Sequence, residues 1–238
     1  MESVPETVEQ QFWHVCRIFS DIADRTPTAL DEIRDKFERN ASIYAPVISE
    51  DLILFNDAYF FRNVLKVLIA LNAIDVDVSN FSLLRDAGCG VGTATIAALA
   101  SGDGGGKQVD ISLEDHSLSQ LDIAKTNIEK AIEFDLFAGD RSVVCKAEIS
   151  SYADNSFTIG SYILCELLAQ GALISDLVRT LRRQYLLIDY GRIISEYLRE
   201  GIFQIENATL SRLTYSVPKA MEGLIGQSTI RVNYLYVW

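Results

Sequence analysis

The stretch that decides the fold is Leu-Leu-Arg-Asp-Ala-Gly-Cys-Gly-Val-Gly-Thr-Ala-Thr, residues 83–95. The apolar run over 81–87 predicts a short strand, and residues 93–100 predict a helix. Three glycines separate the two elements: Gly88, Gly90 and Gly92. Glycine allows a tight turn and lets a ligand approach the backbone closely, and the first turn of the following helix offers free N–H groups. The stretch therefore predicts a ligand-binding turn between a strand and a helix.

Strands and helices alternate along the chain beyond this turn. The predicted strands cover 108–115, 141–147, 156–164 and 184–190. The predicted helices cover 118–132, 166–182 and about ten residues up to 200. A glycine-rich linker is predicted at 101–106. Such alternation indicates right-handed crossovers and a parallel sheet. Two further strand-like runs, 208–217 and 228–238, have no long helix between them. We expect an α/β, Rossmann-like, seven-stranded, mostly parallel sheet with an antiparallel C-terminal hairpin.

The first 75 residues are predicted to be helical. Apolar residues recur at helical spacing over 6–24, and Thr26 followed by Pro27 is a helix-start signal. A third helix over about 57–73 would bury four apolar residues: Phe61, Leu65, Leu68 and Ile69. We expect residues 1–75 to form a helical lid or substrate region, and residues 76–238 to form the α/β domain.

Composition and charge narrow the function classes. The 238 residues are 49% hydrophobic, which is enough for one large core. The formal net charge is -12, and the densest basic cluster is the short run at 179–183. Proteins that bind a phosphate backbone usually carry a basic stripe. The charge therefore favours a small or cationic substrate and disfavours nucleic acid, without excluding an RNA held by a partner protein.

The sequence predicts neither a membrane segment nor a metal site. The N-terminus is acidic and polar, unlike a signal peptide. The longest apolar run, 64–71, is too short to span a bilayer and contains Lys66. The four cysteines show no C-x-x-C spacing, which disfavours a zinc site or a disulfide framework. We expect a cytoplasmic protein.

Two nucleotide-binding patterns fail on spacing at the glycine turn. A dinucleotide fingerprint requires a third glycine where Thr93 stands, and a phosphate-binding loop would require glycine at Ser101 and serine or threonine at Gln108. What remains is an acid followed by G-x-G-x-G, from Asp86 to Gly92. This segment resembles motif I of class I S-adenosylmethionine-dependent methyltransferases, and the resemblance extends over roughly residues 80–190.

The resemblance implies S-adenosylmethionine as the cofactor. The backbone of the three glycines would contact its methionine half, and Ala87, Cys89 and Thr93 would complete the cofactor-binding turn. Asp86 would orient the loop and the cofactor's ammonium group, because a carboxylate attracts ammonium and sulfonium charge.

The family's second landmark is an acid that accepts hydrogen bonds from both ribose hydroxyls after the second strand. The family pattern is D-x-S-x-x-x-L-x-x-A. Counting from Asp115 matches it fully, at Ser117, Leu121 and Ala124, whereas counting from Asp110 fails after Ser112. We therefore favour Asp115, with Glu114 as the alternative, and expect His116 beside the adenine or ribose. A surface role for these carboxylates remains open.

The resemblance weakens after the third and fourth strands. Where the family often has G-D-A, this chain has Cys145-Lys146-Ala147-Glu148, so Glu148 or the Ala147 backbone would have to bind the adenine. Where the family often has S-F-D, the chain has Thr158 as the third residue. These departures leave open a second interpretation, in which the chain binds the cofactor without transferring its methyl group.

Catalytic residues are hard to identify from this sequence, because the cofactor supplies the electrophile and a general base is optional. The candidates are His14 on the first helix and Tyr162 and Glu166 on the substrate side of the fourth strand, with Tyr162 also a cofactor contact. By the resemblance, specificity resides in the N-terminal helices.

Three functions remain open. The first is an S-adenosylmethionine-dependent methyltransferase that acts on a small molecule by in-line transfer. The second is an RNA- or ribosome-associated methyltransferase-like protein. Four segments also resemble methyltransferase-like proteins of the mitochondrial small ribosomal subunit: residues 58–68, the glycine turn, residues 161–167 and residues 186–191. The third is a non-catalytic cofactor-binding module. The C-terminal strand could pair across a homodimer, and an internal hairpin explains it equally well.

Overall fold

A computed structural model of the chain describes residues 2–40, 49–102, 109–136, 142–147, 155–163, 184–194 and 207–238. Its strands are Glu2–Ser3 (β1), Leu83–Ala87 (β2), Asp110–Glu114 (β3), Val143–Lys146 (β4), Ser156–Ser161 (β5), Tyr185–Ile188 (β6), Ala208–Ser216 (β7) and Thr229–Val237 (β8). Its α-helices are Glu6–Ile18 (α1), Ser20–Asn40 (α2), Ser49–Ile74 (α3), Thr93–Ser101 (α4), Leu118–Glu133 (α5) and Glu222–Ile225 (α9). Two 3₁₀ turns cover Val78–Asn80 and Lys219–Met221.

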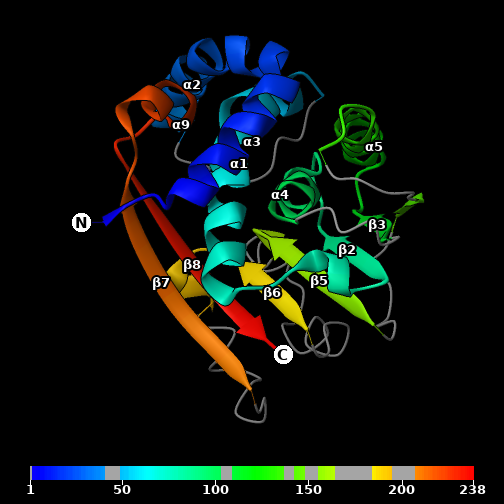
Figure 1. Ribbon diagram of the computed structural model, residues 1–238. Helices are drawn as coiled ribbons and strands as arrows, with labels where there is room; N and C mark the ends of the chain where they lie inside the picture. Colours follow the sequence, from blue (N-terminus) through cyan, green and yellow to red (C-terminus); the bar gives the residue numbers. More distant parts are fainter. Residues whose placement is uncertain are drawn as a thin grey trace.

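The strands form one mixed sheet in the order β1-β7-β8-β6-β5-β2-β3-β4 (Figure 1). Strand β8 is antiparallel to β6 and to β7, and the other described pairs are parallel. This arrangement confirms the predicted α/β fold with its C-terminal antiparallel hairpin. The predicted number of seven strands is wrong, because the chain adds β1 alongside β7. A strand of two residues is too short to show the alternation of apolar residues by which strands are recognised.

The strand order places the glycine turn at a special position in the sheet. From β2 the chain continues to β3 and β4 on one side, and later to β5 and β6 on the other side. The order therefore reverses between β2 and β5. In open α/β sheets, ligands bind outside the carboxyl ends of the strands at such a switch point. The turn that follows β2 lies there.

Helix α2 runs through Pro27, so the predicted helix start at this proline is wrong. The break lies instead at Phe19, whose backbone (φ -105°, ψ 41°) ends α1. Proline in a helix lacks the N–H that would bond to the preceding turn. Thr26 Oγ1 donates to the carbonyl oxygens of Ile22 and Asp57, each at 2.9 Å, and so links α2 to α3 beside the proline.

The N-terminal helices share one apolar core with the sheet. Helices α1, α3, α4 and α5 lie together on one face of the sheet (Figure 1). Phe12 of α1 and Phe61 of α3 are fully buried, with ring centroids 5.9 Å apart. The predicted burial of the third helix is confirmed, because its four predicted core residues are all buried. The lid role of residues 1–75 stays a prediction. Within the described residues, no helix is long and apolar enough to cross a membrane.

Some predicted elements lie outside the described residues. They are the helix at 166–182, the linker beyond residue 102 and the continuation of a helix from 195 to about 200.

Candidate functional site

The glycine turn adopts a conformation that only glycine enters easily. Gly88, Gly90 and Gly92 have φ angles of 66°, 53° and 84°, in the left-handed region that side chains disfavour. The Gly92 N–H donates to the Cys89 carbonyl at 2.8 Å and closes the turn. The local sequence is therefore what allows the chain to reverse here and enter α4.

Strand β3 holds the turn in place. The N–H groups of Gly88 and Cys89 donate to the Glu114 carbonyl at 2.7 and 3.1 Å. The Gly90 N–H donates to Oδ2 of Asp115 at 2.9 Å, and Oδ1 of Asp115 accepts from the Ser117 N–H at 2.9 Å. The Asp115 side chain is only 1% exposed. Its carboxylate is thus fixed between the turn and the start of α5.

Helix α5 supports the turn from the other end. Its N-terminal cap is Ser117, whose Oγ accepts from the Gln120 N–H at 3.4 Å. Asn127 Nδ2 donates to the Val91 carbonyl of the turn at 3.0 Å. Leu121 and Ala124 are buried beneath it.

Asp86 is a buried acid that faces α4. Its Oδ2 accepts from both the N–H and the Oγ1 of Thr95, at 3.0 and 2.8 Å. Within the described residues, Oδ1 has no hydrogen-bond partner. Burial raises the pKa of Asp86 from 3.8 to about 7, and the nearby charges of Asp115 and Glu114 act in the same direction, while the Thr95 bonds oppose them. Asp86 anchors the helix that leaves the turn.

The Glu114 carboxylate lies on the other face of the sheet from Asp86, because Glu114 is paired in register with Ala87. Arg85 holds it through two contacts, Nη2–Oε2 at 3.0 Å and Nε–Oε1 at 3.2 Å, and both side chains are buried. Ser112 Oγ donates to the same carboxylate at 2.9 Å. The structure therefore places Asp115, not the Glu114 side chain, against the turn.

The predicted adenine side is only partly described. His116 has a side chain that is 65% exposed, with Nδ1 3.4 Å from Asp115 Oδ1. Ala147 is exposed just after β4. Lys146, where the family often has an aspartate, places Nζ 3.7 Å from Glu114 Oε1. Glu148 lies outside the described residues.

Tyr162 directly follows β5, in a left-handed conformation (φ 63°) that is unusual for tyrosine. Its N–H donates to the Ile188 carbonyl at 2.7 Å. Its neighbour Ile163 lies so close to Gly88 that a Cβ added there would be 2.9 Å away. Tyr162 and the glycine turn are therefore adjacent. The third predicted catalytic residue, Glu166, lies outside the described residues.

Lys66 of α3 is a site residue that the sequence analysis did not identify. Its Nζ forms a hydrogen bond with Tyr162 Oη. Burial lowers the pKa of Lys66 from 10.5 to about 8, helped by the charge of Arg62 and opposed by that of Asp189. The signal was available, since Lys66 interrupts an otherwise apolar run on a buried helix.

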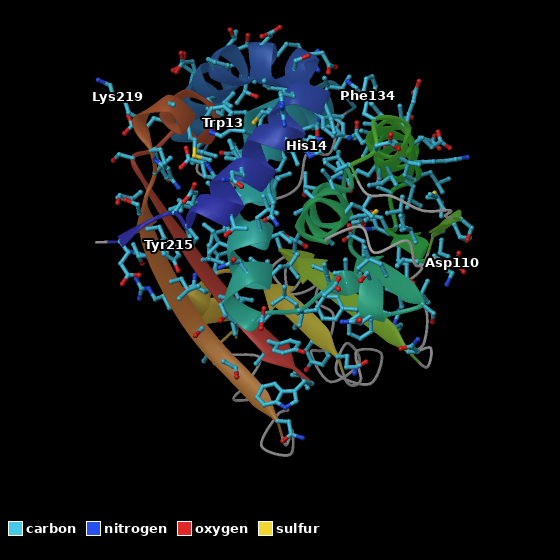
Figure 2. All side chains as sticks on the ribbon, in the orientation of Figure 1. Trp13, His14, Asp110, Phe134, Tyr215 and Lys219 are labelled. Carbon is cyan, nitrogen blue, oxygen red and sulfur yellow. The ribbon has the colours of Figure 1, made fainter. Side chains whose placement is uncertain are left out.

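His14, the remaining catalytic candidate, is half-buried on α1. Figure 2 shows it next to Trp13, apart from Asp110 at the start of β3. Among the described residues, no hydrogen bond or ion pair links His14 to the turn, to Asp115 or to Tyr162.

Asp110, the acid that the family pattern did not favour, lies at the opposite end of β3 from the turn. Its carboxylate accepts from Ser142 Oγ at 2.7 Å.

Comparisons with known proteins give likenesses of fold. A scan against protein-family models and a search of curated proteins give no match. A precorrin-6y C5,15-methyltransferase from Geobacter metallireducens is 13% identical with a TM-score of 0.47, over 72% of this chain and 87% of that one. A magnesium protoporphyrin IX methyltransferase from Synechocystis, solved with bound SAH, is 14% identical with a TM-score of 0.47, over 88% and 96%. An O-methyltransferase from Bacillus cereus is 13% identical with a TM-score of 0.43, over 87% and 97%.

Proposed function

We propose that this chain is an S-adenosylmethionine-dependent methyltransferase that acts on a small molecule by in-line methyl transfer. The observation that carries the proposal is the glycine turn at the switch point of the sheet, with the Asp115 carboxylate hydrogen-bonded to its centre at Gly90. The turn and the acid come from neighbouring strands, β2 and β3, as a cofactor that lies across their ends requires.

The residues present suit this cofactor. A Cβ placed on Gly90 would meet no atom of the described residues within 4 Å, so the backbone faces open space in that part of the structure. The Asp115 carboxylate beside it has two oxygens, each with more than one acceptor position, which suits a pair of ribose hydroxyls. The Asp115 carboxylate also brings negative charge to the turn, which suits a sulfonium and an ammonium group. When bound, S-adenosylmethionine would supply the electrophilic methyl group.

The proposed roles of the chain's residues are binding and positioning. Asp115 would hold the ribose, and the backbone of Gly88 to Gly92 would line the methionine half. His116 and the Ala147 backbone would border the adenine. Glu114 would act through its carbonyl, which anchors the turn, because its carboxylate is engaged by Arg85. Holding the acceptor in line with the methyl group lowers the activation barrier, because the two reactants no longer have to meet and align in solution.

The arrangement of positive charges supports a small acceptor over RNA. Two arginines in the described part of the chain form contacts within the protein: Arg85 pairs with Glu114, and Arg62 donates to the Ile225 carbonyl at 2.8 Å. The net charge of -12 also disfavours a phosphate backbone as the ligand.

Two glycine substitutions should separate folding from cofactor binding. Gly90→Ala adds a methyl group to open space, so it should cost only about 1 kcal/mol of stability for the left-handed backbone. It should weaken S-adenosylhomocysteine about 10- to 100-fold, because that space is where we place the ligand. Gly88→Ala, which drives the methyl group against Ile163, should cost about 3 kcal/mol of stability. Urea unfolding and calorimetry measure the two effects; equal ligand affinity in Gly90→Ala and wild type would contradict the placement.

A methyl-transfer screen tests the reaction itself. The protein is incubated with S-adenosylmethionine carrying a tritiated methyl group and with either a small-molecule extract or total RNA. We expect label in the small-molecule fraction, and none with Asp115→Ala. Label in RNA alone would establish the RNA-directed alternative. Cofactor binding without label in either pool would favour the non-catalytic module.

A further inference from the structure

Lys66 and Tyr162 form a pair of titratable side chains to which the proposed function above assigns no role. Lys66 extends from α3, and its Nζ bonds to Tyr162 Oη at the end of β5. The same Nζ lies 4.9 Å from the centre of the Tyr162 ring. The pair therefore joins the N-terminal helical layer to the carboxyl edge of the sheet.

This pair stands beside the turn to which the cofactor is assigned. Gly160 of β5 is paired in register with Ala87 of β2, the residue just before the turn. Tyr162 follows two residues later, and Ile163 contacts the Cβ position of Gly88. A group bound at Tyr162 Oη would thus lie at the ends of β2 and β5, next to the methionine half of the cofactor.

The local charges suit proton acceptance at Lys66. Its pKa falls to about 8 through burial, with Arg62 of α3 lowering it further and Asp189 at the end of β6 opposing. Tyr190, which is 51% exposed, stands edge-on to Tyr162 with ring centroids 5.4 Å apart. An amine with this pKa carries a neutral fraction near neutral pH, whereas an ordinary lysine is almost fully charged.

The backbone of Tyr162 adds a second, independent observation. Its φ of 63° is costly for a tyrosine. Such conformations persist where the surrounding structure enforces them, and they gather at binding and catalytic sites. Here the N–H bond to the Ile188 carbonyl holds the residue in that conformation, with its hydroxyl at Lys66.

We infer that Lys66 and Tyr162 bind a phenol-type hydroxyl of the methyl acceptor and take its proton, an inference that rests on the proposed function. The acceptor O–H gives its proton to Tyr162 Oη while Tyr162 gives its own proton to Lys66 Nζ. The electron pair of the O–H bond stays on the acceptor oxygen, where it becomes available for the new bond to carbon, and the amine becomes an ammonium group. Proton and charge balance, and no further reactant is needed.

The chemistry of the pair favours a phenol over other acceptors. A phenol has a pKa near that of tyrosine, about 10, so the transfer of its proton to an amine with a pKa of about 8 is unfavourable by only about two pKa units. An aliphatic alcohol is far less acidic. A cationic amine would be repelled by Lys66 and Arg62. The two tyrosine rings offer edges and faces for an aromatic acceptor.

Proton acceptance can be tested on the protein alone. Acetic anhydride reacts with neutral amines only, so the labelling of each lysine against pH, followed by peptide mass spectrometry, gives its titration. We expect Lys66 to be labelled with a midpoint near pH 8, and Tyr162→Phe to shift that midpoint. The internal control is Lys125, which is 52% exposed on α5. A Lys66 that titrates with Lys125, or that is not labelled at any pH, overturns the inference, because the acceptor must reach the pair.

Acceptor binding is tested with 4-nitrophenol, whose ionised form absorbs visible light. With S-adenosylhomocysteine at saturation, the wild-type protein should increase the ionised fraction of the phenol. Lys66→Met should weaken phenolate binding at least about 10-fold, a typical effect of removing a charged partner, and Lys125→Met should not. An unchanged ionised fraction in wild type, or an unchanged affinity in Lys66→Met, overturns the inference. Calorimetry on the same samples keeps the two proposals apart: if S-adenosylhomocysteine itself does not bind, it is the proposed function that fails.

Discussion

Asp115→Ala should weaken S-adenosylhomocysteine binding about 1,000-fold, since two hydrogen bonds to a charged group contribute roughly 1.5–3 kcal/mol each. The Asp115 carboxylate lies against the glycine turn, where we place the ribose. Its Oδ2 accepts from the Gly90 N–H, and its Oδ1 accepts from the Ser117 N–H. Asp115→Asn removes the charge but keeps one acceptor, so its loss should be intermediate. Isothermal titration calorimetry gives the three dissociation constants.

Asp110→Ala is the matched control for this series. Asp110 lies on the same strand, β3, but at its far end, where it pairs with Ser142. The control should bind S-adenosylhomocysteine like wild type. Thermal unfolding of each variant separates lost contacts from a disordered turn, because Asp115 also anchors the backbone. If Asp110→Ala loses affinity and Asp115→Ala does not, the assignment of the ribose-binding acid is wrong.

Asp86→Asn should abolish a pH dependence of stability that wild type shows between about pH 4 and pH 7. The pKa of Asp86 is raised from 3.8 to about 7 in the folded protein, mainly by burial. The folded state therefore keeps a proton that the unfolded chain releases in this range. The stability that Asp86 contributes is complete below about pH 4 and is lost as the pH rises through 7, a difference of roughly 4 kcal/mol.

Asparagine is neutral at every pH and can still accept the two bonds from Thr95. At about pH 8, the variant should therefore exceed wild type in its free energy of unfolding by as much as about 4 kcal/mol, and near pH 4 the two should agree. Urea unfolding at a series of pH values measures this. Asp122→Asn, which changes an exposed acid on α5, should follow wild type. A parallel pH dependence in Asp86→Asn and wild type would contradict a protonated Asp86.

Much of the fold could be predicted because its strands carry strong local signals. The runs that became β2, β3, β5 and β6 are apolar and are bounded by turn residues, and the glycines mark where the first of them ends. Strand β1 has two residues and no pattern, so only its pairing with β7 reveals it. The predicted helix start at Pro27 was wrong for another reason. Proline usually interrupts a helix, but α2 continues through Pro27, and next to it the Thr26 hydroxyl donates to the Asp57 carbonyl of α3.

The candidate site also contains residues that the sequence could indicate and residues that it could not. The family resemblance favours Asp115 as the ribose-binding acid, because serine, leucine and alanine follow it at the family's spacing, and this role stays a prediction. Glu114 was the alternative at the level of sequence, and the ion pair with Arg85 shows where its carboxylate lies. Lys66 lies 96 residues from Tyr162, and no local pattern joins them. Their contact depends on how α3 lies across the sheet.

The most direct test of the central claim is a calorimetric titration of the wild-type protein with S-adenosylhomocysteine. We predict saturable one-to-one binding at micromolar ligand, lost in Asp115→Ala and retained in Asp110→Ala. Absence of heat and of thermal stabilisation in wild type, even at hundreds of micromolar ligand, would contradict the assignment of the glycine turn to this cofactor.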